Sequence, residues 1–242
     1  MNSQEIITKT LPVEMNKIST LNNRNEFTII HSQNLKQKTL EEFVLAIDAK
    51  IGKIRKFFNQ PAINIPVFIF PDQQSLHSFV IGSKGEDWLV GFGGAGSVKI
   101  IDPDMATNYN KTYQGILKCV VHEIVHIFTN LGYRKKSIVM SEGIAEYFAE
   151  QHNQGAIEAA AKNIYEIAND LFNAKSSVEL GHVNYGYDLA YTVADYMFKK
   201  YDETKVQKYF ASRDFEPFEL LNIERNDFIS NWANFVVKNY SF

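Results

Sequence analysis

Five residues whose types and spacing are suited to chemistry lie between positions 122 and 146. His122, Glu123 and His126 form the pattern H-E-x-x-H, and Glu142 and Glu146 follow in a second cluster. Four residues are slightly more than one helical turn, so both imidazole rings would project from one helix face, where a single metal ion can bind them. Glu123 would point about 100° further round, beside the metal, where a base can take a proton from water.

The residues around the motif predict a buried helix at the centre of the fold. Nearly all of them are apolar, which is typical of a helix that is covered on every side. Histidine and glutamate side chains in such a place would be costly without partners. The apolar neighbours are Cys119, Val120, Val121, Ile124, Val125, Ile127 and Phe128.

A catalytic zinc ion needs a third protein ligand and an open position, and two histidines with one glutamate are a known set. Glu142 follows His126 by 142 − 126 = 16 positions, enough for a turn and a second helix that packs back. Glu146, one turn later, could accept the ring N–H of a ligand histidine. The alternative for both carboxylates is a solvated charged face, and Glu150 is expected to be surface.

The elements before the motif alternate between strand and helix. Residues 26–31 are typical of a strand, residues 39–58 of an amphipathic helix, residues 65–70 of a buried strand and residues 73–81 of a helix capped by Asp72. A glycine-rich segment, residues 90–96, leads into a strand at 97–101 rather than into a helix, which argues against a phosphate loop. We expect residues 97–101 to be an edge strand that can pair with an extended peptide, and residues 90–96 to be a hairpin or flap.

Composition and charge exclude several classes. The chain has 242 residues, 45% of them hydrophobic and 22% charged, with a net charge of -3 and no long basic run, so we expect neither nucleic acid nor membrane as a partner. The single cysteine, Cys119, excludes a disulfide framework and favours a reducing compartment. We therefore expect a cytoplasmic protein, although a secretion signal that had been removed would leave no trace in these residues.

"HEIVH" followed by "SEGIAEYF" resembles the gluzincin zinc metallopeptidases, the thermolysin-like and aminopeptidase-N-like superfamily, and especially its compact bacterial peptidase-MA-like domains. The resemblance implies that His122, His126 and Glu142 bind Zn²⁺ and that Glu123 is the catalytic base. It extends loosely over residues 26–242, through "IPVFIFPDQQSLHSFV", "SVKIIDP", "YDLAYTVADYM" and "DFISNWANFVV". One departure is Val139, at a position where the superfamily often has an aromatic residue.

The fold that this resemblance implies is α+β and zincin-like. It has an N-terminal α/β lobe with a small mixed sheet and an edge strand, a central H-E-x-x-H helix and a C-terminal helical lobe. We expect a loosely ordered arm at residues 1–25 and one metallopeptidase domain at 26–242, with the first lobe at 26–131 and the second at 132–242. Helical breaks are expected near 132, 176–186 and 213–217.

A zinc peptidase also needs a donor for the oxyanion of the tetrahedral intermediate. Tyr187 matches the tyrosine that the compact domains often have, His182 is similar in context to the donor histidine of the thermolysin-like enzymes, and Tyr185 is a third candidate. The sequence favours Tyr187 and leaves the other two open. The remaining histidines, His31, His77 and His152, lack metal-like spacing and are expected to be structural or on the surface.

The function that these residues predict is zinc-dependent peptide hydrolysis by an activated water. No cluster of residues matches a grip on a peptide terminus, so an endopeptidase is favoured over an exopeptidase. Two alternatives are a cytosolic regulatory protease with one protein substrate and a zincin-like binding module without turnover. The expected partner is a peptide or protein substrate, and the sequence does not give the oligomeric state.

Overall fold

The computed structural model describes residues 17–19, 27–32, 34–109, 111–130, 136–212, 214, 216 and 218–241. The chain divides into two compact units. The first consists of Met1–Arg55 and Asn59–Ile127, and the second of Lys56–Phe58 and Phe128–Phe242. The expected arm at residues 1–25 lies outside the described residues, except for a short strand at Lys17–Ser19.

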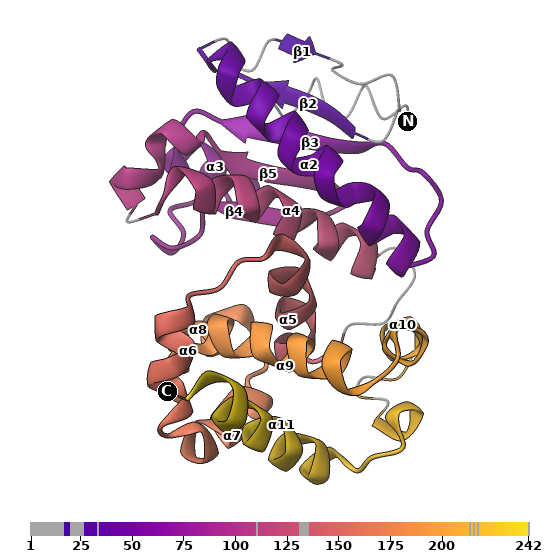
Figure 1. Cartoon of the computed structure of the whole chain (residues 1–242). Helices are drawn as coiled ribbons and strands as arrows, with labels where there is room; N and C mark the ends of the chain where they lie inside the picture. Colours follow the sequence, from indigo (N-terminus) through magenta and orange to yellow (C-terminus); the bar gives the residue numbers. More distant parts are fainter. Residues whose placement is uncertain are drawn as a thin grey trace. The chain divides into compact units, whose positions relative to one another are not determined.

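The first unit contains a mixed sheet of five strands, drawn in Figure 1. Its strands are β1 (Lys17–Ser19), β2 (Phe27–His31), β3 (Ile65–Phe70), β4 (Gly91–Gly94) and β5 (Ser97–Ile101). Their order is β1-β2-β3-β5-β4; β2, β3 and β5 are parallel, whereas β1 and β4 run antiparallel to their neighbours. The predicted α+β class with a mixed sheet is therefore confirmed.

The expectation that residues 97–101 form an edge strand is wrong. β5 is paired on both sides, with β3 and with β4, and the edge strand is β4, which the glycine-rich segment forms. The chain can reverse tightly between β4 and β5 because Ala95 and Gly96 both adopt positive φ, at 50° and 72°. Two consecutive left-handed residues make the kind of turn whose twist matches a two-strand hairpin.

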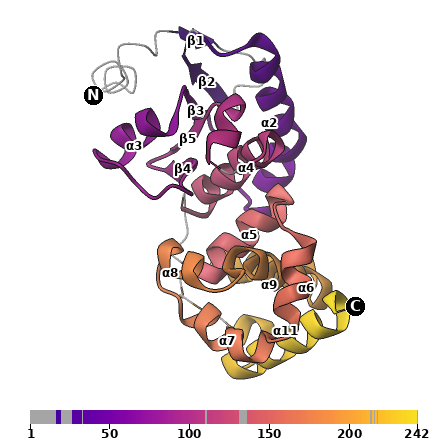
Figure 2. The ribbon, with the colours of Figure 1, turned by 90° about the vertical axis from the view of Figure 1, so that its left-hand side faces the viewer.

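Helices cover both faces of this sheet. In Figure 2, α2 (Gln37–Phe57) and α4 (Tyr113–Asn130) lie on one side, and α3 (Gln73–Ile81) lies on the other. A short 3-10 helix, η1 (Pro103–Tyr109), leads toward α4. The predicted apolar stripe of α2 is mostly buried, and Asp72 caps α3 by accepting a hydrogen bond from the backbone N–H of Ser75 at 2.7 Å. Of the predicted stripe, Val44 is only partly buried and Phe58 lies just beyond the helix, where it is buried; the buried residues within α2 are Leu40, Phe43, Ile47, Ile51 and Ile54.

The second unit is helical throughout its described residues. Its elements are α5 (Ile138–Ala149), α6 (Gln154–Ala161), α7 (Ile164–Asn173), α8 (Ser177–His182), α9 (Gly186–Lys200), α10 (Glu203–Ala211), η2 (Phe218–Leu221) and α11 (Arg225–Tyr240). Figure 1 shows α9 between α5 and α11, and α9 contacts both. The expected break at 176–186 contains α8, which Ser176 starts by capping the N–H of Glu179.

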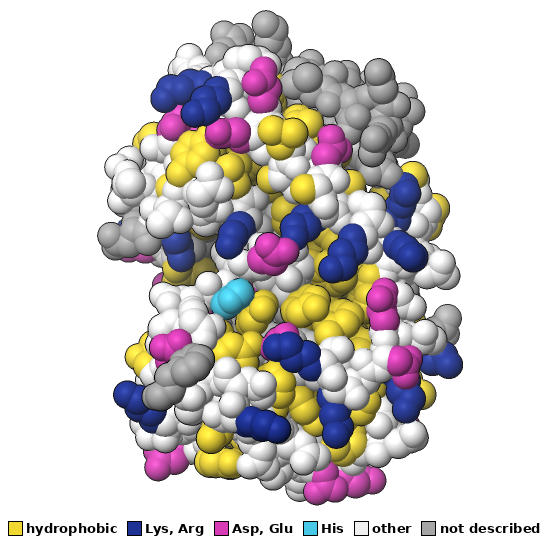
Figure 3. Space-filling model, viewed as in Figure 1, with side chains coloured by type: hydrophobic (Ala, Val, Ile, Leu, Met, Phe, Trp, Pro, Cys, Tyr) yellow, Lys and Arg dark blue, Asp and Glu magenta, His cyan; other side chains and the backbone are white. Residues whose placement is uncertain are grey.

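Buried polar contacts join α9 to α11. The indole N–H of Trp232 donates to Thr192 at 2.9 Å, and the Tyr240 hydroxyl donates to Asp195 at 2.6 Å. Such paired groups fix the register of two helices because each would be costly to bury alone. On the face drawn in Figure 3, side chains of both charge signs are scattered among hydrophobic ones. No helix in the described part of the chain is long and apolar enough to cross a membrane.

Candidate metal centre

Helix α4 carries the H-E-x-x-H residues. Its side chains from Ile116 to Phe128 are mostly apolar and buried, as expected for a covered helix. His122 is 6% exposed and His126 is partly exposed. One helical turn apart, the two rings lie with centroids 4.7 Å apart and direct their Nε2 atoms at each other across 3.0 Å.

This arrangement of the two histidines fits a single metal ion. Two Zn–N bonds of about 2.0–2.1 Å at a tetrahedral angle place their nitrogens about 3.4 Å apart. The observed separation of the two Nε2 atoms, 3.0 Å, is close to that value. The two Nε2 atoms are therefore close enough for one metal ion to bind both.

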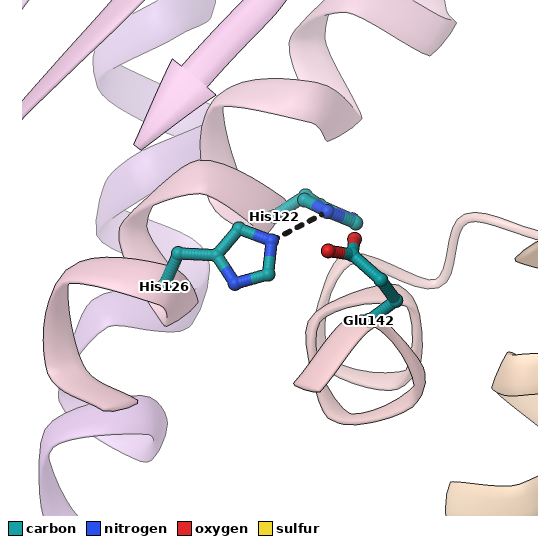
Figure 4. Close-up of side chains that lie close together, drawn as sticks. All are labelled: His122, His126 and Glu142. Carbon is teal, nitrogen blue, oxygen red and sulfur yellow. Dashed lines mark hydrogen bonds between the residues drawn. The ribbon is translucent and has the colours of Figure 1, made fainter. Parts of the chain in front are cut away.

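Glu142 supplies the third candidate ligand atom, from α5. One ligand atom from each of His122, His126 and Glu142 lies within 4.8 Å of the other two. Figure 4 shows the Glu142 carboxylate and the two rings turned toward one another. Glu142 is 7% exposed, and a carboxylate so buried is costly unless a cation or hydrogen-bond donors compensate it. Two imidazoles and one carboxylate are a donor set that suits zinc and leaves room for another ligand.

Glu123 lies against the edge strand β4. Its side chain is 8% exposed, and its carboxylate runs along the backbone of Gly91 and Gly93. A Cβ added at Gly91 would lie 3.2 Å from Oε1 of Glu123, and one at Gly93 would lie 2.9 Å from Oε2 and would also strike the backbone carbonyl of Glu123. Glycine at both positions therefore makes room for the carboxylate on this face of the strand.

Cys119 lies one turn before Glu123 on α4. It is buried, as the sequence predicted for a packing residue, and its Sγ is 3.8 Å from Oε1 of Glu123. A Cβ at Gly91 would also lie 2.7 Å from this sulfur. The thiol is a weak hydrogen-bond donor, so it adds a soft contact that helps to hold the carboxylate on the strand.

Lys99 is a buried cation on β5, next to β4. It is 7% exposed, and its Nζ donates to the carbonyl of Gly94 at 2.8 Å and to that of Ser97 at 3.3 Å. Burial lowers the pKa of Lys99 to about 8, while the negative charge of Glu123 acts in the opposite direction. A carboxylate near an ammonium group favours the charged form of the lysine because their charges are opposite.

Gly143, the residue after Glu142, fixes how α5 packs on α9. A Cβ at Gly143 would strike the backbone carbonyl of Ala190. The two helices can approach this closely only because position 143 has no side chain. Glu146 is buried one turn further along α5, and its proposed contact with a ligand histidine stays a prediction. Glu150 is exposed and adopts positive φ at the end of the helix, as expected for a surface residue.

The three candidate oxyanion donors lie around the α8–α9 junction. Tyr187, in the first turn of α9, donates from its hydroxyl to the carbonyl of Ser177 at 3.3 Å. Tyr185 is exposed and takes the left-handed conformation that precedes α9. His182, exposed at the end of α8, lines a hollow of about 440 Å³ together with Asp170 and Glu179. Tyr187 is the only one of the three that lies one turn from Ala190, on the part of α9 that faces α5 near Glu142.

The remaining histidines have structural surroundings. His77 is buried, with Nε2 2.9 Å from the carbonyl of Leu89 and Nδ1 accepting from the N–H of Gly85 at 2.9 Å. His152 stacks on Tyr191 with ring centroids 3.8 Å apart, and His31 is buried within β2. These positions agree with the sequence expectation for all three.

Sequence reasoning missed two features of this site. The expected hairpin at residues 90–96 is present as β4, its turn and β5. The alternation of Gly91 and Gly93, which leaves one face of β4 without side chains, was the part that sequence reasoning missed. Lys99 stands in the apolar run "SVKII", and a lone charge in a buried strand was the available signal for it. Neither signal indicates that Glu123 lies near these residues, because Glu123 is distant from them in the sequence.

Neither family models nor curated proteins match this chain. Among solved structures, partial likenesses are found to a two-domain M1 zinc metallopeptidase mutant bound to L-arginine (13% identity, TM-score 0.46) and to an M1 zinc metallopeptidase from Deinococcus radiodurans, as a mutant (13%, 0.45) and unmutated (13%, 0.42). They cover 89%, 93% and 93% of this chain and 48%, 52% and 50% of those chains, so the chain spans about half their length. TM-scores below 0.5 do not show a shared fold, and the functional argument therefore rests on the residues themselves.

Proposed function

We propose that this chain is a zinc-dependent peptidase. The observation that carries the proposal is the convergence of ligand atoms from His122, His126 and Glu142 within 4.8 Å, with the carboxylate of Glu123 next to His122 on the same helix. A bound zinc ion would supply Lewis acidity, which lowers the pKa of a coordinated water and polarises a substrate carbonyl.

Glu123 is the proposed general base. It accepts a proton from the attacking water and then donates that proton to the nitrogen of the leaving amine. One residue therefore serves first as the base and then as the acid. Its place along Gly91 and Gly93 keeps the carboxylate at the edge strand of the sheet, where it could accept a proton from a water that attacks a peptide paired with β4. Tyr187 is the proposed donor to the oxyanion, with His182 and Tyr185 as the alternatives.

The proposed substrate is an extended peptide that pairs with β4. Among the described residues, β4 pairs with a strand on one side only, β5, so its other edge could pair with a further strand. Pairing at β4, rather than at residues 97–101, also brings the peptide beside the strand that the Glu123 carboxylate contacts. A substrate that pairs with β4 as an added strand could extend past both ends of the strand, as an endopeptidase requires.

The test of the proposed function compares the wild type with Glu123→Gln in a peptide-library digest, with zinc measured in both proteins. We expect near-stoichiometric zinc in both and a loss of turnover of about 10²–10⁴-fold in the variant, because general base catalysis contributes that much. Wild-type protein that binds no zinc, or a Glu123→Gln variant that keeps full activity, would overturn the proposal.

The same digest separates the two alternatives. A regulatory protease with one substrate would bind zinc and leave a generic library intact, but it would cleave its own partner in an extract in a Glu123-dependent way. A binding module would bind zinc and cleave nothing in either assay. Retention of Glu123 argues against the module, since a scaffold without turnover has no chemical need for a base beside the ligands.

A further inference from the structure

Lys99 is a buried cation whose two hydrogen-bond acceptors, the carbonyls of Gly94 and Ser97, belong to its own hairpin. It lies in the middle of β5, every residue of which is buried. A buried ammonium group is costly unless its donors are satisfied, and a carboxylate partner is the usual solution. In the described part of the chain no carboxylate forms an ion pair with Lys99; its Nζ instead donates to the carbonyls of Gly94 and Ser97.

These two carbonyls are the ends of the β4–β5 turn. Gly94 and Ser97 are register partners, and Ala95 and Gly96 between them take positive φ. The carbonyl of Gly94 also accepts a hydrogen bond from the Ser97 hydroxyl at 3.4 Å, and the ring of Phe92 lies 5.4 Å from the Lys99 ammonium. The Lys99 ammonium group therefore bonds to both ends of the β4–β5 turn.

The residues of strand β4, whose end Lys99 holds, have a low intrinsic preference for strand structure. Three of the four residues of β4 are glycine, which has the largest conformational freedom to lose and no side chain to pack. Within the described residues, β4 also has a paired strand on one side only. The position of this strand matters for chemistry, because the carboxylate of Glu123 lies along Gly91 and Gly93.

We propose that Lys99 is a positioning residue for peptide binding, which fixes edge strand β4 where the substrate backbone pairs by holding the carbonyls of Gly94 and Ser97. This inference rests on the proposed peptidase function. Lys99 touches no reacting atom in this scheme; it acts through β4. Loss of the ammonium group leaves the base and the ligands in place but lets the strand move, so substrate binding weakens more than the chemical step does.

The second unit contains a matched control for this effect. Lys136 is also buried, its Nζ donates to the carbonyls of Ser212 at 2.9 Å and Asp214 at 2.6 Å, and it lies 5.4 Å from the ring of Tyr209. Burial lowers the pKa of this lysine to about 8, as it does for Lys99. Lys136→Met therefore removes a buried ammonium group from nearly the same chemical surroundings without touching β4.

The experiment compares wild type, Lys99→Met, Lys99→Arg and Lys136→Met, all loaded with zinc, on short and long peptides. We expect KM for long peptides to rise about tenfold in Lys99→Met, because a hydrogen bond from a charged donor is worth about that factor. We expect kcat to stay within about twofold, Lys99→Arg to recover most of the affinity, and Lys136→Met to leave KM unchanged. Amide hydrogen exchange across residues 91–97 should accelerate in Lys99→Met alone.

Each other outcome decides against one of the two claims. Equal KM in Lys99→Met and Lys136→Met, with an active wild type, overturns the inference and leaves the peptidase function standing. A zinc-loaded wild type that cleaves nothing overturns the function, and unchanged exchange at residues 91–97 overturns the role of Lys99 in holding β4. If Lys99→Met does not fold, Lys99→Gln, which keeps a neutral donor of shorter reach, takes its place and is judged by the same readouts.

Discussion

The helices that carry the candidate ligands, α4 and α5, are both packed through glycine, but in opposite ways. Beside α4 the glycines are on the facing strand, at Gly91 and Gly93, and the space is occupied by the Cys119 sulfur and by the carboxylate and backbone carbonyl of Glu123. In α5 the glycine is on the helix itself, at Gly143, and the group that occupies the space is the backbone of Ala190. One arrangement shapes the surroundings of a side chain, and the other sets the distance between two helices.

This difference follows the chemistry that each unit is proposed to supply. A general base must hold its carboxylate within hydrogen-bond reach of water, so the surface beside it has to be shaped around one side chain. A metal ligand at the start of a helix is placed when the whole helix is placed, and interaxial distance depends on the residues at the contact. The glycines of the first unit therefore help to orient the Glu123 carboxylate, and the glycine of the second unit sets the position of α5, which carries Glu142.

The largest expected effect comes from removing a ligand on either side of this comparison. His122→Ala and Glu142→Gln should each lower zinc affinity by more than about 100-fold, because even changes in groups that support ligands cost about 10–100-fold. Metal analysis after dialysis measures the effect, and Glu150→Gln, at an exposed position on the same helix as Glu142, is the control. Full zinc content in either ligand variant would remove that residue from the site.

The next effect tests the contribution of the second unit to catalysis. Tyr187→Phe should lower kcat by about 10²–10³-fold at unchanged zinc content, because one oxyanion donor contributes that much. Tyr165→Phe, at an exposed tyrosine on α7, should leave kcat unchanged. A rate in Tyr187→Phe equal to that of the wild type would move the proposed role to His182 or Tyr185.

Two glycine substitutions test the comparison directly. Gly93→Ala and Gly143→Ala should each destabilise the fold by about 1–3 kcal/mol, the usual range for overpacking. Gly93→Ala should lower turnover while zinc affinity is kept, since the added Cβ meets Glu123. Gly143→Ala should instead weaken zinc binding, since it moves the helix that carries Glu142. Urea unfolding, zinc titration and peptide turnover on both variants measure these three quantities.

Gly52→Ala is the matched control for both substitutions. Gly52 lies at an exposed position in α2, and a Cβ there would meet nothing within 4 Å. Replacing glycine by alanine at an unstrained helical position stabilises a protein by about 0.4–1 kcal/mol. The same pattern of zinc and turnover changes in Gly93→Ala and Gly143→Ala would show that the two glycines do not have different tasks.

The smallest expected effect is on the pH dependence of stability, where the two units should behave alike. Burial lowers the folded-state pKa of Lys99 and of Lys136 from 10.5 to about 8. Between about pH 8 and pH 10.5 the unfolded chain therefore binds more protons than the folded chain, so stability should rise with pH in this window. Buried tyrosines with a raised pKa, such as Tyr191, oppose the rise only above their ordinary value of 10.0.

Urea unfolding from about pH 7 to pH 9.5 measures this rise in the wild type. Lys99→Met and Lys136→Met should each remove part of it, and the double variant should remove most of it. A double variant whose stability rises with pH as much as that of the wild type would show that other groups cause the dependence.

Much of the local structure could be predicted from the sequence because it depends on short-range periodicity. The stripe of α2, the strand at Ile65–Phe70 and the Asp72 cap follow from residue types a few positions apart. The coarse α+β class follows from the order of these elements. For the site, the spacing of His122 and His126 indicated a shared face, and the structure brings their Nε2 atoms to 3.0 Å.

The sequence by itself determined which residues can do chemistry, since residue type and helical spacing are properties of a short segment. Only the tertiary structure decided which strand is at the edge of the sheet, which glycines pack against Glu123 and which carbonyls accept the hydrogen bonds of Lys99. Strand order depends on which of several similar apolar runs pair, and the pattern within one run does not specify its partner. The roles of the glycines at 91, 93 and 143 likewise depend on the tertiary structure, because the absence of a side chain matters only where another part of the chain occupies that space.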